Sequence, residues 1–237
     1  VPSTPLQIDR ADGTYSPVSI DCSSNARNGT ISAPITLKAE HERQAHLVPS
    51  RANTDAFGIA NCSYWTIEGL HMQGLGQSSA AACEISGGVL ISVTTSHYIN
   101  VKRNLVDRLD GNGNLAAIFI GYNSDHIVVE ANEVYDIGLA GGQGSCPTAC
   151  NCNNKAIQIY QSTDVVVRRN YVNQRSGRAD LLEDINPYPA SRVLVENNIV
   201  EQGGEAFSVD PSQYGPNGPT NSEDNQFYGN IAMGANL

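Results

Sequence analysis

Side chains that could move protons or bind cations are concentrated in the second half of the chain. Lys155 and Arg178 are candidate bases, because a Lys or Arg accepts a proton when its surroundings depress its pKa. Tyr160 is the candidate acid. Carboxylate oxygens are the ligands that Ca²⁺ prefers, and the candidate calcium ligands are Glu183, Asp184 and Asp210. These residues can act together only if the fold brings their segments onto one surface.

A short pattern recurs six times and predicts how these segments come together. The best copy is Ser162 to Val172, and the others are Cys62 to Met72, Ser96 to Val106, Ser124 to Val134, Ala190 to Val200 and Ser222 to Ala232. The first apolar positions are Trp65, Ile99, Ile127, Val165 and Val193, with Asn225 in the last copy. Steps of 34, 28, 38, 28 and 32 residues separate them, and a period of this size indicates stacked units.

Each copy reads as a strand followed by a bend, with one polar and one charged position repeated from copy to copy. Position five is Asn in five copies: Asn104, Asn132, Asn170, Asn198 and Asn230, with Leu70 in the first. We expect each amide to bond its own bend and the Asn one rung away. Position three alternates in charge through Glu68, Lys102, Glu130, Arg168 and Glu196, and ends in Tyr228. Parallel strands paired in register, roughly 4.8 Å apart, place these opposite charges side by side.

A second strand precedes most copies, which makes each unit one coil of two or three short strands. These strands are Gly87 to Ile91, Ala117 to Ile120, Ala156 to Ile159 and Ala206 to Val209. The sequence therefore predicts an all-β, right-handed parallel β-helix with about six to eight coils. Residues 1–30 are expected to form an extended, poorly paired lead-in, and residues 31–237 the β-helix domain.

The stretch Ala33-Pro-Ile-Thr-Leu-Lys-Ala-Glu40, followed by Tyr64-Trp-Thr-Ile-Glu-Gly-Leu70, resembles the secreted bacterial β-helix proteins of the pectate-lyase-like superfamily. The resemblance extends over about residues 30 to 232. Members that cleave acidic polysaccharides do so by β-elimination, which needs charge neutralisation, a base and an acid. Residues of this chain that could fill these roles are Lys155 or Arg178 as base and Tyr160 as acid, with Ca²⁺ as the neutralising ion. The catalytic strings of pectate, alginate and chondroitin lyases are absent, as are the Asp-Asp and His-Gly strings of polygalacturonase-like hydrolases.

Outward side chains of the second strands are the expected substrate surface, a long shallow groove suited to a polymer. Alignment on Ile118, Ile157, Leu182 and Phe207 gives the outward column Phe119, Gln158, Glu183 and Ser208. Leu181 could equally be the buried residue of the third strand. A simpler alternative for Lys155 is an ion pair with Asp180 one rung away. For Glu183 and Asp184 the alternative is a solvated acidic turn.

Composition narrows the class of protein. The protein is acidic, with a net charge of −10, a pI near 4.8 and no Lys/Arg run, so we expect neither nucleic acid nor anionic membranes as partners. No apolar stretch is long enough to span a membrane. Six cysteines predict an oxidising, extracellular setting with up to three disulfides. For Cys146, Cys150 and Cys152 we favour disulfides over a metal site. A start at Val1 suggests a processed chain. The spacing of His41, His46 and His71 matches no metal motif.

Two functions from different classes fit this sequence. The first is an extracellular carbohydrate-active enzyme, lyase-like on an acidic polysaccharide. The second is a structural or adhesive protein that assembles end to end into filaments through uncapped β-helix ends, where unpaired backbone groups invite another chain. A non-catalytic sugar-binding module or a hydrolase with paired carboxylates is a further alternative.

Overall fold

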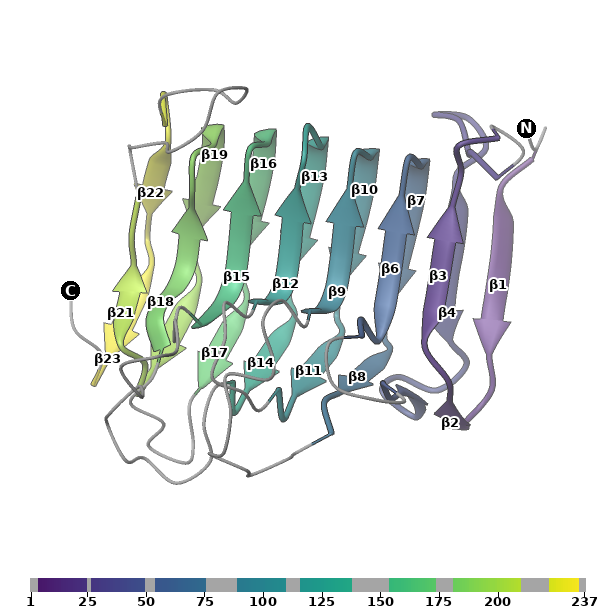
Figure 1. Ribbon diagram of the computed structural model, residues 1–237, viewed down its shortest axis with the longest axis horizontal. Helices are drawn as coiled ribbons and strands as arrows, with labels where there is room; N and C mark the ends of the chain where they lie inside the picture. The colour runs from purple at the N-terminus through teal and green to yellow at the C-terminus, as the bar shows by residue number, and fades with distance from the viewer. Residues whose placement is uncertain are drawn as a thin grey trace.

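The computed structural model describes residues 4–24, 27–49, 54–75, 89–109, 116–137, 154–173, 181–209 and 222–234, with the backbone alone for residues 181 and 182. These residues form three parallel sheets that run the length of the molecule, with the two chain ends at opposite ends of the stack (Figure 1). Among the described residues no helix is long and apolar enough to cross a membrane.

Sheet A contains one strand from every coil. Its strands are β1 (Leu6–Arg10), β4 (Ile35–Ala39), β7 (Ser63–Glu68), β10 (His97–Lys102), β13 (Asp125–Glu130), β16 (Thr163–Arg168), β19 (Ser191–Glu196) and β22 (Gln226–Tyr228). Sheet B follows it in each coil. Its strands are β2 (Gly13–Tyr15), β5 (Ala45–Leu47), β8 (His71–Gln73), β11 (Leu105–Asp107), β14 (Glu133–Tyr135), β17 (Tyr171–Asn173), β20 (Ile199–Glu201) and β23 (Ile231–Met233).

Sheet C closes the first seven coils, and each of its strands leads into the next strand of sheet A. Its strands are β3 (Val18–Asp21), β6 (Phe57–Ala60), β9 (Val89–Thr94), β12 (Ala116–Gly121), β15 (Asn154–Tyr160), β18 (Leu181–Pro187) and β21 (Glu205–Phe207). Eight strands in each of sheets A and B correspond to eight coils, which confirms the predicted parallel β-helix.

The first coil begins earlier than the sequence suggested. Strands β1, β2 and β3 lie within residues 6–21 and pair in parallel with β4, β5 and β6. This segment is thus a full coil rather than the extended, poorly paired lead-in expected for residues 1–30. Its side chains are more exposed than those of later coils, for example Leu6 at 46% and Ile8 at 38%. Exposed positions such as these dilute the apolar pattern of residues 6–21, so the sequence gives a weak signal for this coil.

The core is a continuous column of apolar side chains enclosed by the three sheets. In each copy of the repeat the apolar positions point inward, as Val165, Val167 and Val172 do with no exposed surface. Burial of apolar surface contributes roughly 25 cal/mol per Å², and it is most complete in the central coils. Each coil therefore depends mainly on its two neighbours.

The Asn column forms a buried hydrogen-bonded ladder. Asn132 is representative: its Nδ2 donates to Val101 O at 2.9 Å and to Asn170 Oδ1 at 3.0 Å, and its backbone N–H donates to the same Oδ1 at 2.9 Å. The amides of Asn104, Asn132, Asn170 and Asn198 each bond the coils on both sides, which confirms the predicted contact between rungs. The expected bond of each amide to its own bend is not seen among these contacts. In the first copy, the backbone N–H of Leu70 donates to Asn104 Oδ1 at 3.0 Å.

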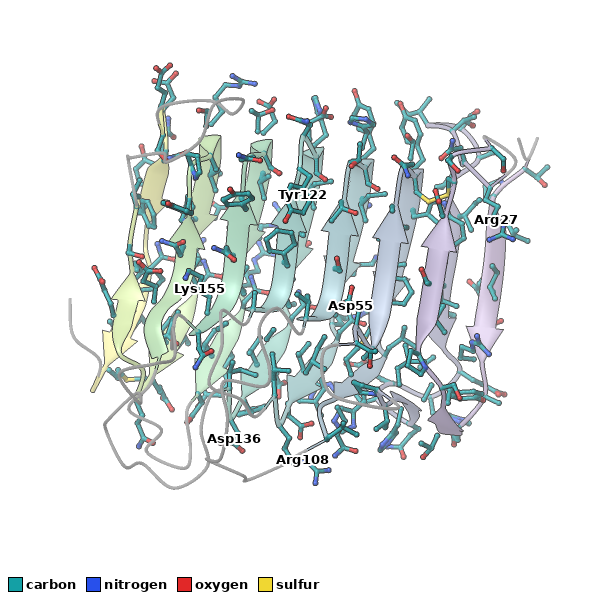
Figure 2. The ribbon with its side chains drawn as sticks, in the orientation of Figure 1. Arg27, Asp55, Arg108, Tyr122, Asp136 and Lys155 are labelled. Carbon is teal, nitrogen blue, oxygen red and sulfur yellow. A yellow bond between two sulfur atoms is a disulfide. The ribbon has the colours of Figure 1, made fainter. Side chains whose placement is uncertain are left out.

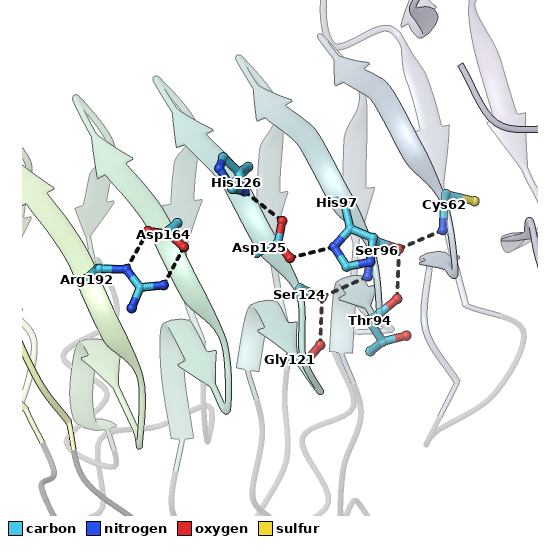
Figure 3. A network of polar contacts seen from close by, with 10 residues as sticks. All are labelled: Cys62, Thr94, Ser96, His97, Gly121, Ser124, Asp125, His126, Asp164 and Arg192. Atoms are coloured by element: carbon cyan, nitrogen blue, oxygen red, sulfur yellow. Dashed lines mark hydrogen bonds and ion pairs between the residues drawn. The ribbon is translucent and has the colours of Figure 1, made fainter. Parts of the chain in front are cut away.

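Two further ladders stabilise the outside of sheet A and the turns that lead into it. The alternating charges pair as predicted, with Lys102 Nζ 2.9 Å from Glu68 Oε2 and Arg168 3.1 Å from Glu130. In the turns, the backbone N–H of Cys62 donates to Ser96 Oγ, and that of Ser96 donates to Ser124 Oγ. Figure 3 shows this serine ladder beside the contacts of His97 and His126 with Asp125.

A disulfide joins Cys22, after β3, to Cys62, before β7. It therefore links the first coil to the turn that opens the third. One of the three predicted disulfides is confirmed in this way. Cys146, Cys150 and Cys152 lie outside the described residues.

Candidate functional site

The outward face of sheet C carries three rows of side chains, each with one residue per coil. The start row, at the beginning of the strands, is Asp55, Val89, Ala116, Lys155, Glu183 and Glu205. The middle row is Ser19, Gly58, Ser92, Phe119, Gln158 and Asn186, with Ser208 after it. The end row is Ala60, Thr94, Gly121 and Tyr160. Figure 2 labels Asp55, Tyr122 and Lys155 on this sheet.

Regular strand alternation is broken between the start row and the middle row. Two consecutive residues, such as Ala117 and Ile118 in β12, are both fully buried and belong to the core. Start-row residues therefore face the same side as the middle row, and Val89 and Ala116 line one pocket together with Phe119. Strict two-residue alternation predicts that start-row residues point into the core, because each lies two residues before a core residue such as Ile118. The outward start row could therefore not be found from that pattern.

Three of the four predicted substrate-binding residues share one row. Phe119, Gln158 and Ser208 lie along the middle row. Glu183 does not, because the alignment on Leu182 is wrong. Ile185 is the residue that pairs with Ile157 and with Phe207, and the register shifts at a bulge between Asn154 and Lys155.

Asn186 occupies the middle-row position that the sequence assigned to Glu183. Its Nδ2 donates to Ser208 Oγ at 2.8 Å, whereas its buried Oδ1 has no hydrogen-bond partner. A buried acceptor left in this state costs about 1–3 kcal/mol, so it calls for a ligand or a water.

Lys155 lies in the start row beside Glu183. Its Nζ is 3.1 Å from Glu183 Oε2, and its side chain is only 1% exposed. In the observed register Lys155 aligns with Glu183, three residues after Asp180, the ion-pair partner that the sequence suggested. Asp180 itself lies outside the described residues, as does Arg178, the other candidate base.

Tyr160 belongs to an aromatic cluster at the far ends of the sheet C strands. Ring centroids lie 5.7 Å apart for Tyr122 and Tyr160, 5.8 Å for Tyr160 and Tyr188, and 6.2 Å for Phe119 and Tyr160. These pairs are tilted or edge-to-face, so the ring faces are not covered by each other. Such an array can contact the apolar faces of sugar rings.

Asp184 faces the core rather than the groove. On the adjacent strands it lies between Ala156 and Ala206, both fully buried core residues, and its carboxyl group contacts Gly203, where a Cβ would overlap with it. Neither carboxylate oxygen has a hydrogen-bond partner. Burial raises the pKa of Asp184 to about 8 because nothing compensates its charge.

The expected calcium set is not assembled by the residues that the structure describes. Glu183 faces outward and pairs with Lys155, whereas Asp184 faces inward, so the two side chains point to opposite sides of β18. Asp210 lies outside the described residues. Within the described ranges no group of three His, Cys, Asp or Glu side chains converges on a point. Calcium binding stays a prediction.

A pocket of about 250 Å³ opens on this face at β6, β9 and β12. Its lining is Asp55, Val89, Ser92, Thr94, Ala116, Phe119, Tyr122 and Gln158. Burial raises the pKa of Asp55, while hydrogen bonds from the Val89 backbone and the Ser92 side chain oppose that rise. Sequence reasoning missed Asp55, Ser92 and Tyr122. Asp55 could have been found from its position two residues before Phe57. The strand that contains Phe57 was not included in the alignment, which used only later strands.

The histidines of the early coils do not form a metal site in the described residues. His71 Nε2 lies 2.9 Å from Asp107 Oδ1, and the rings of His46 and His71 are 4.5 Å apart. His41 instead contacts Asp12 on the surface.

Comparisons with known proteins find similarity in structure but not in sequence. No family model and no curated protein matches the chain. A pectin methylesterase in complex with a hexasaccharide matches with a TM-score of 0.55 and 11% identity, over 100% of this chain and 83% of that chain. A second such complex gives 0.50 and 12%, over 100% and 84%. An alginate lyase from Paenibacillus sp. gives 0.46 and 15%, over 99% and 94%.

At these identities the likeness shows the fold alone. The chain is a right-handed parallel β-helix, the fold of these pectin methylesterases, which confirms the predicted fold and its handedness.

Proposed function

We propose that this chain is an extracellular carbohydrate-active β-helix that binds an acidic polysaccharide along the sheet C face and cleaves it by β-elimination. The observation that carries the proposal is the contact between the buried Lys155 and the partly exposed Glu183, on the same face as Gln158 and Tyr160. Two proteins with the same fold are pectin methylesterases in complex with hexasaccharides. The Cys22–Cys62 disulfide favours an oxidising compartment outside the cell.

Lys155 is the proposed base and Glu183 the proposed acid. One proton transfer over the 3.1 Å contact between Lys155 Nζ and Glu183 Oε2 converts the ion pair into a neutral amine and a neutral carboxyl group. The amine then takes the proton beside the uronate carboxyl group, and the Glu183 carboxyl group protonates the leaving oxygen. The products are an unsaturated uronate end, a free hydroxyl group and the original ion pair.

Tyr160 is better placed to bind substrate than to protonate it. It is five residues from Lys155 along β15, which is roughly 16 Å between Cα atoms at about 3.3 Å per residue. We therefore assign the Tyr160 ring, with Phe119 and Tyr188, to sugar contacts. Gln158 and Asn186 provide hydrogen-bonding groups between the two ends of the strands.

The test follows the ultraviolet absorbance of unsaturated uronate ends while the protein is incubated with polygalacturonate, alginate or sulfated glycosaminoglycans. Lys155→Met should lower the rate about 10²–10⁴-fold, the usual contribution of a general base. Lys102→Met, which removes the corresponding ion pair of sheet A, is the matched control and should leave the rate unchanged. Lack of product on every polymer, or equal rates in wild type and Lys155→Met, would contradict the assignment.

End-to-end association is a second candidate that one observation favours. In the last described coil, Tyr228, Ile231 and Met233 are 59%, 49% and 44% exposed, and the rings of Phe207 and Phe227 border a hollow of about 440 Å³. Sedimentation velocity over a range of protein concentrations tests it. Association that Ile231→Asp abolishes would support this function, and a monomer at all concentrations would exclude it.

A further inference from the structure

The Asp55 pocket lies on the proposed substrate face but away from the proposed chemistry. Asp55 precedes β6, and β9 and β12 separate β6 from β15, where Lys155 lies. Three rung steps of roughly 4.8 Å place the two positions about 14 Å apart along the stack. A polymer that follows the sheet C face and reaches Lys155 therefore also passes over this pocket.

We propose that this pocket is a subsite for a single uncharged sugar residue of the polymer, and that Asp55 selects against a charged uronate at that position. The inference rests on the proposed function and adds the class of substrate. The polymer would be a polysaccharide in which charged sugar units alternate or mix with neutral or esterified ones.

The pocket walls suit one sugar ring. Its volume of about 250 Å³ is below the roughly 300–1,000 Å³ of sites for drug-sized ligands, so it has room for one ring rather than several. Phe119 and Tyr122 form one wall with ring centroids 5.5 Å apart and planes inclined by 58°. Tyr122 is 51% exposed, which leaves ring surface for the apolar face of a sugar.

The polar groups of the pocket favour hydroxyl donors. Asp55 accepts hydrogen bonds from the Val89 backbone and the Ser92 side chain, which hold its carboxyl group in place at the pocket wall. A carboxylate has about four acceptor positions, so further positions are available for sugar hydroxyls. Gln158, at the opposite side of the lining, offers both donors and an acceptor.

A uronate carboxylate in this pocket would meet a charge of the same sign. The described residues that line the pocket include no Lys or Arg, and the protein as a whole carries a net charge of −10. Like charges brought together in a partly desolvated site repel each other and weaken binding. An esterified or neutral residue avoids this repulsion and keeps its hydroxyl contacts with Asp55.

Calorimetric titration with two six-residue oligosaccharides tests the inference: a fully de-esterified oligogalacturonate and its fully methyl-esterified counterpart. Both are titrated into Lys155→Met protein, which prevents cleavage, with and without Asp55→Asn. We expect the esterified ligand to bind more tightly to the protein with Asp55. Asp55→Asn should strengthen binding of the charged ligand about tenfold or more and change binding of the esterified ligand less than about threefold, because it removes only the repulsion.

Tyr122→Ala should weaken both ligands, because it removes the ring wall and no charge. Glu196→Gln, which removes a carboxylate from sheet A, is the control and should change neither affinity. If both ligands bind and Asp55→Asn leaves their ratio unchanged, the inference is overturned while the proposed function survives. If neither ligand binds, both are overturned.

Discussion

The outward faces of sheets A and C are built from the same coils, yet they differ in how completely their side chains satisfy one another. On sheet A, Lys102 pairs with Glu68, and the rings of Tyr64 and Tyr98 stack face to face, 4.6 Å apart and 2° from parallel. On sheet C, the rings of Tyr122 and Tyr160 meet at 81°, and buried polar atoms such as Asn186 Oδ1 lack partners.

The difference shows which face has spare capacity for binding. Where each rung contacts an identical or complementary residue on the next rung, ring faces and charges are already covered, so the repeat contributes stability and presents little to a ligand. Where the repeat is irregular, as at the bulge beside Lys155, polar groups and ring faces stay available. Irregularity within a solenoid is therefore a guide to function.

The largest expected effect breaks the regular part of the structure. Asn170→Leu removes the acceptor of both the backbone and the side-chain N–H of Asn132, and leaves Val129 O without its donor. Buried groups left unsatisfied cost about 1–3 kcal/mol each, so unfolding in urea should show a loss on the order of 4 kcal/mol. Asn100→Leu, which removes one long contact at 3.4 Å to Thr66 on the outside, is the control. Similar small losses in both variants would show that the ladder is not essential.

Asp184 allows a prediction about pH. Its carboxyl group ionises near 3.8 when unfolded and near 8 when folded, so between these values the folded state binds the extra proton. Stability should therefore fall as pH rises from about 4 to 8, by at most about 1.4 kcal/mol per pH unit. Urea midpoints at pH 4.5 and 7.5 should differ less in Asp184→Asn than in wild type. An identical pH dependence in both proteins would refute the buried, uncompensated carboxyl group.

Gly203→Ala tests the same corner of the core by crowding it. The new Cβ would overlap with the Asp184 carboxyl group, and overpacking of this kind costs about 1–3 kcal/mol. Thermal unfolding should show a lower midpoint, which Asp184→Ala restores in part by removing the clash. Gly58→Ala, whose Cβ would lie 3.7 Å from Asp55 Oδ2, is the control and should unfold like wild type.

The smallest effect is expected on the charged row of sheet A. Glu68→Gln removes the partner of Lys102 and Arg103, and such surface pairs contribute about 0–1 kcal/mol. The loss in melting experiments should shrink further in high salt, because exposed charges are screened. A loss of several kcal/mol that is insensitive to salt would mean that this face is more than a set of surface ion pairs.

The regular features of the fold could be predicted from the sequence because they repeat. Six copies of one pattern placed Asn132 and Asn170 one rung apart and set Glu130 beside Arg168. The first coil escaped prediction, since the apolar pattern of residues 6–21 is diluted by exposed positions.

The candidate site could be predicted only in part, because it lies where the repeat is irregular. Phe119 and Gln158 were found because β12 and β15 keep one register. Asn186 was missed because a bulge beside Lys155 shifts the register of β18. Asp55 was missed because the in-and-out alternation of the strand breaks between the start row and the middle row, so a strict two-residue period does not predict that it faces the pocket. Local sequence does not encode a register shift, which depends on how the neighbouring coils pack.

The most direct test of the central claim, that sheet C is the binding face, is affinity gel electrophoresis in polygalacturonate with two matched tyrosine variants. Tyr160→Ala removes a ring from the sheet C cluster, whereas Tyr98→Ala removes one from the stacked row of sheet A. The account predicts that the polymer retards wild type and Tyr98→Ala equally and that Tyr160→Ala loses most of the retardation. Retardation that survives in Tyr160→Ala and is lost in Tyr98→Ala would place binding on the other face and contradict the account.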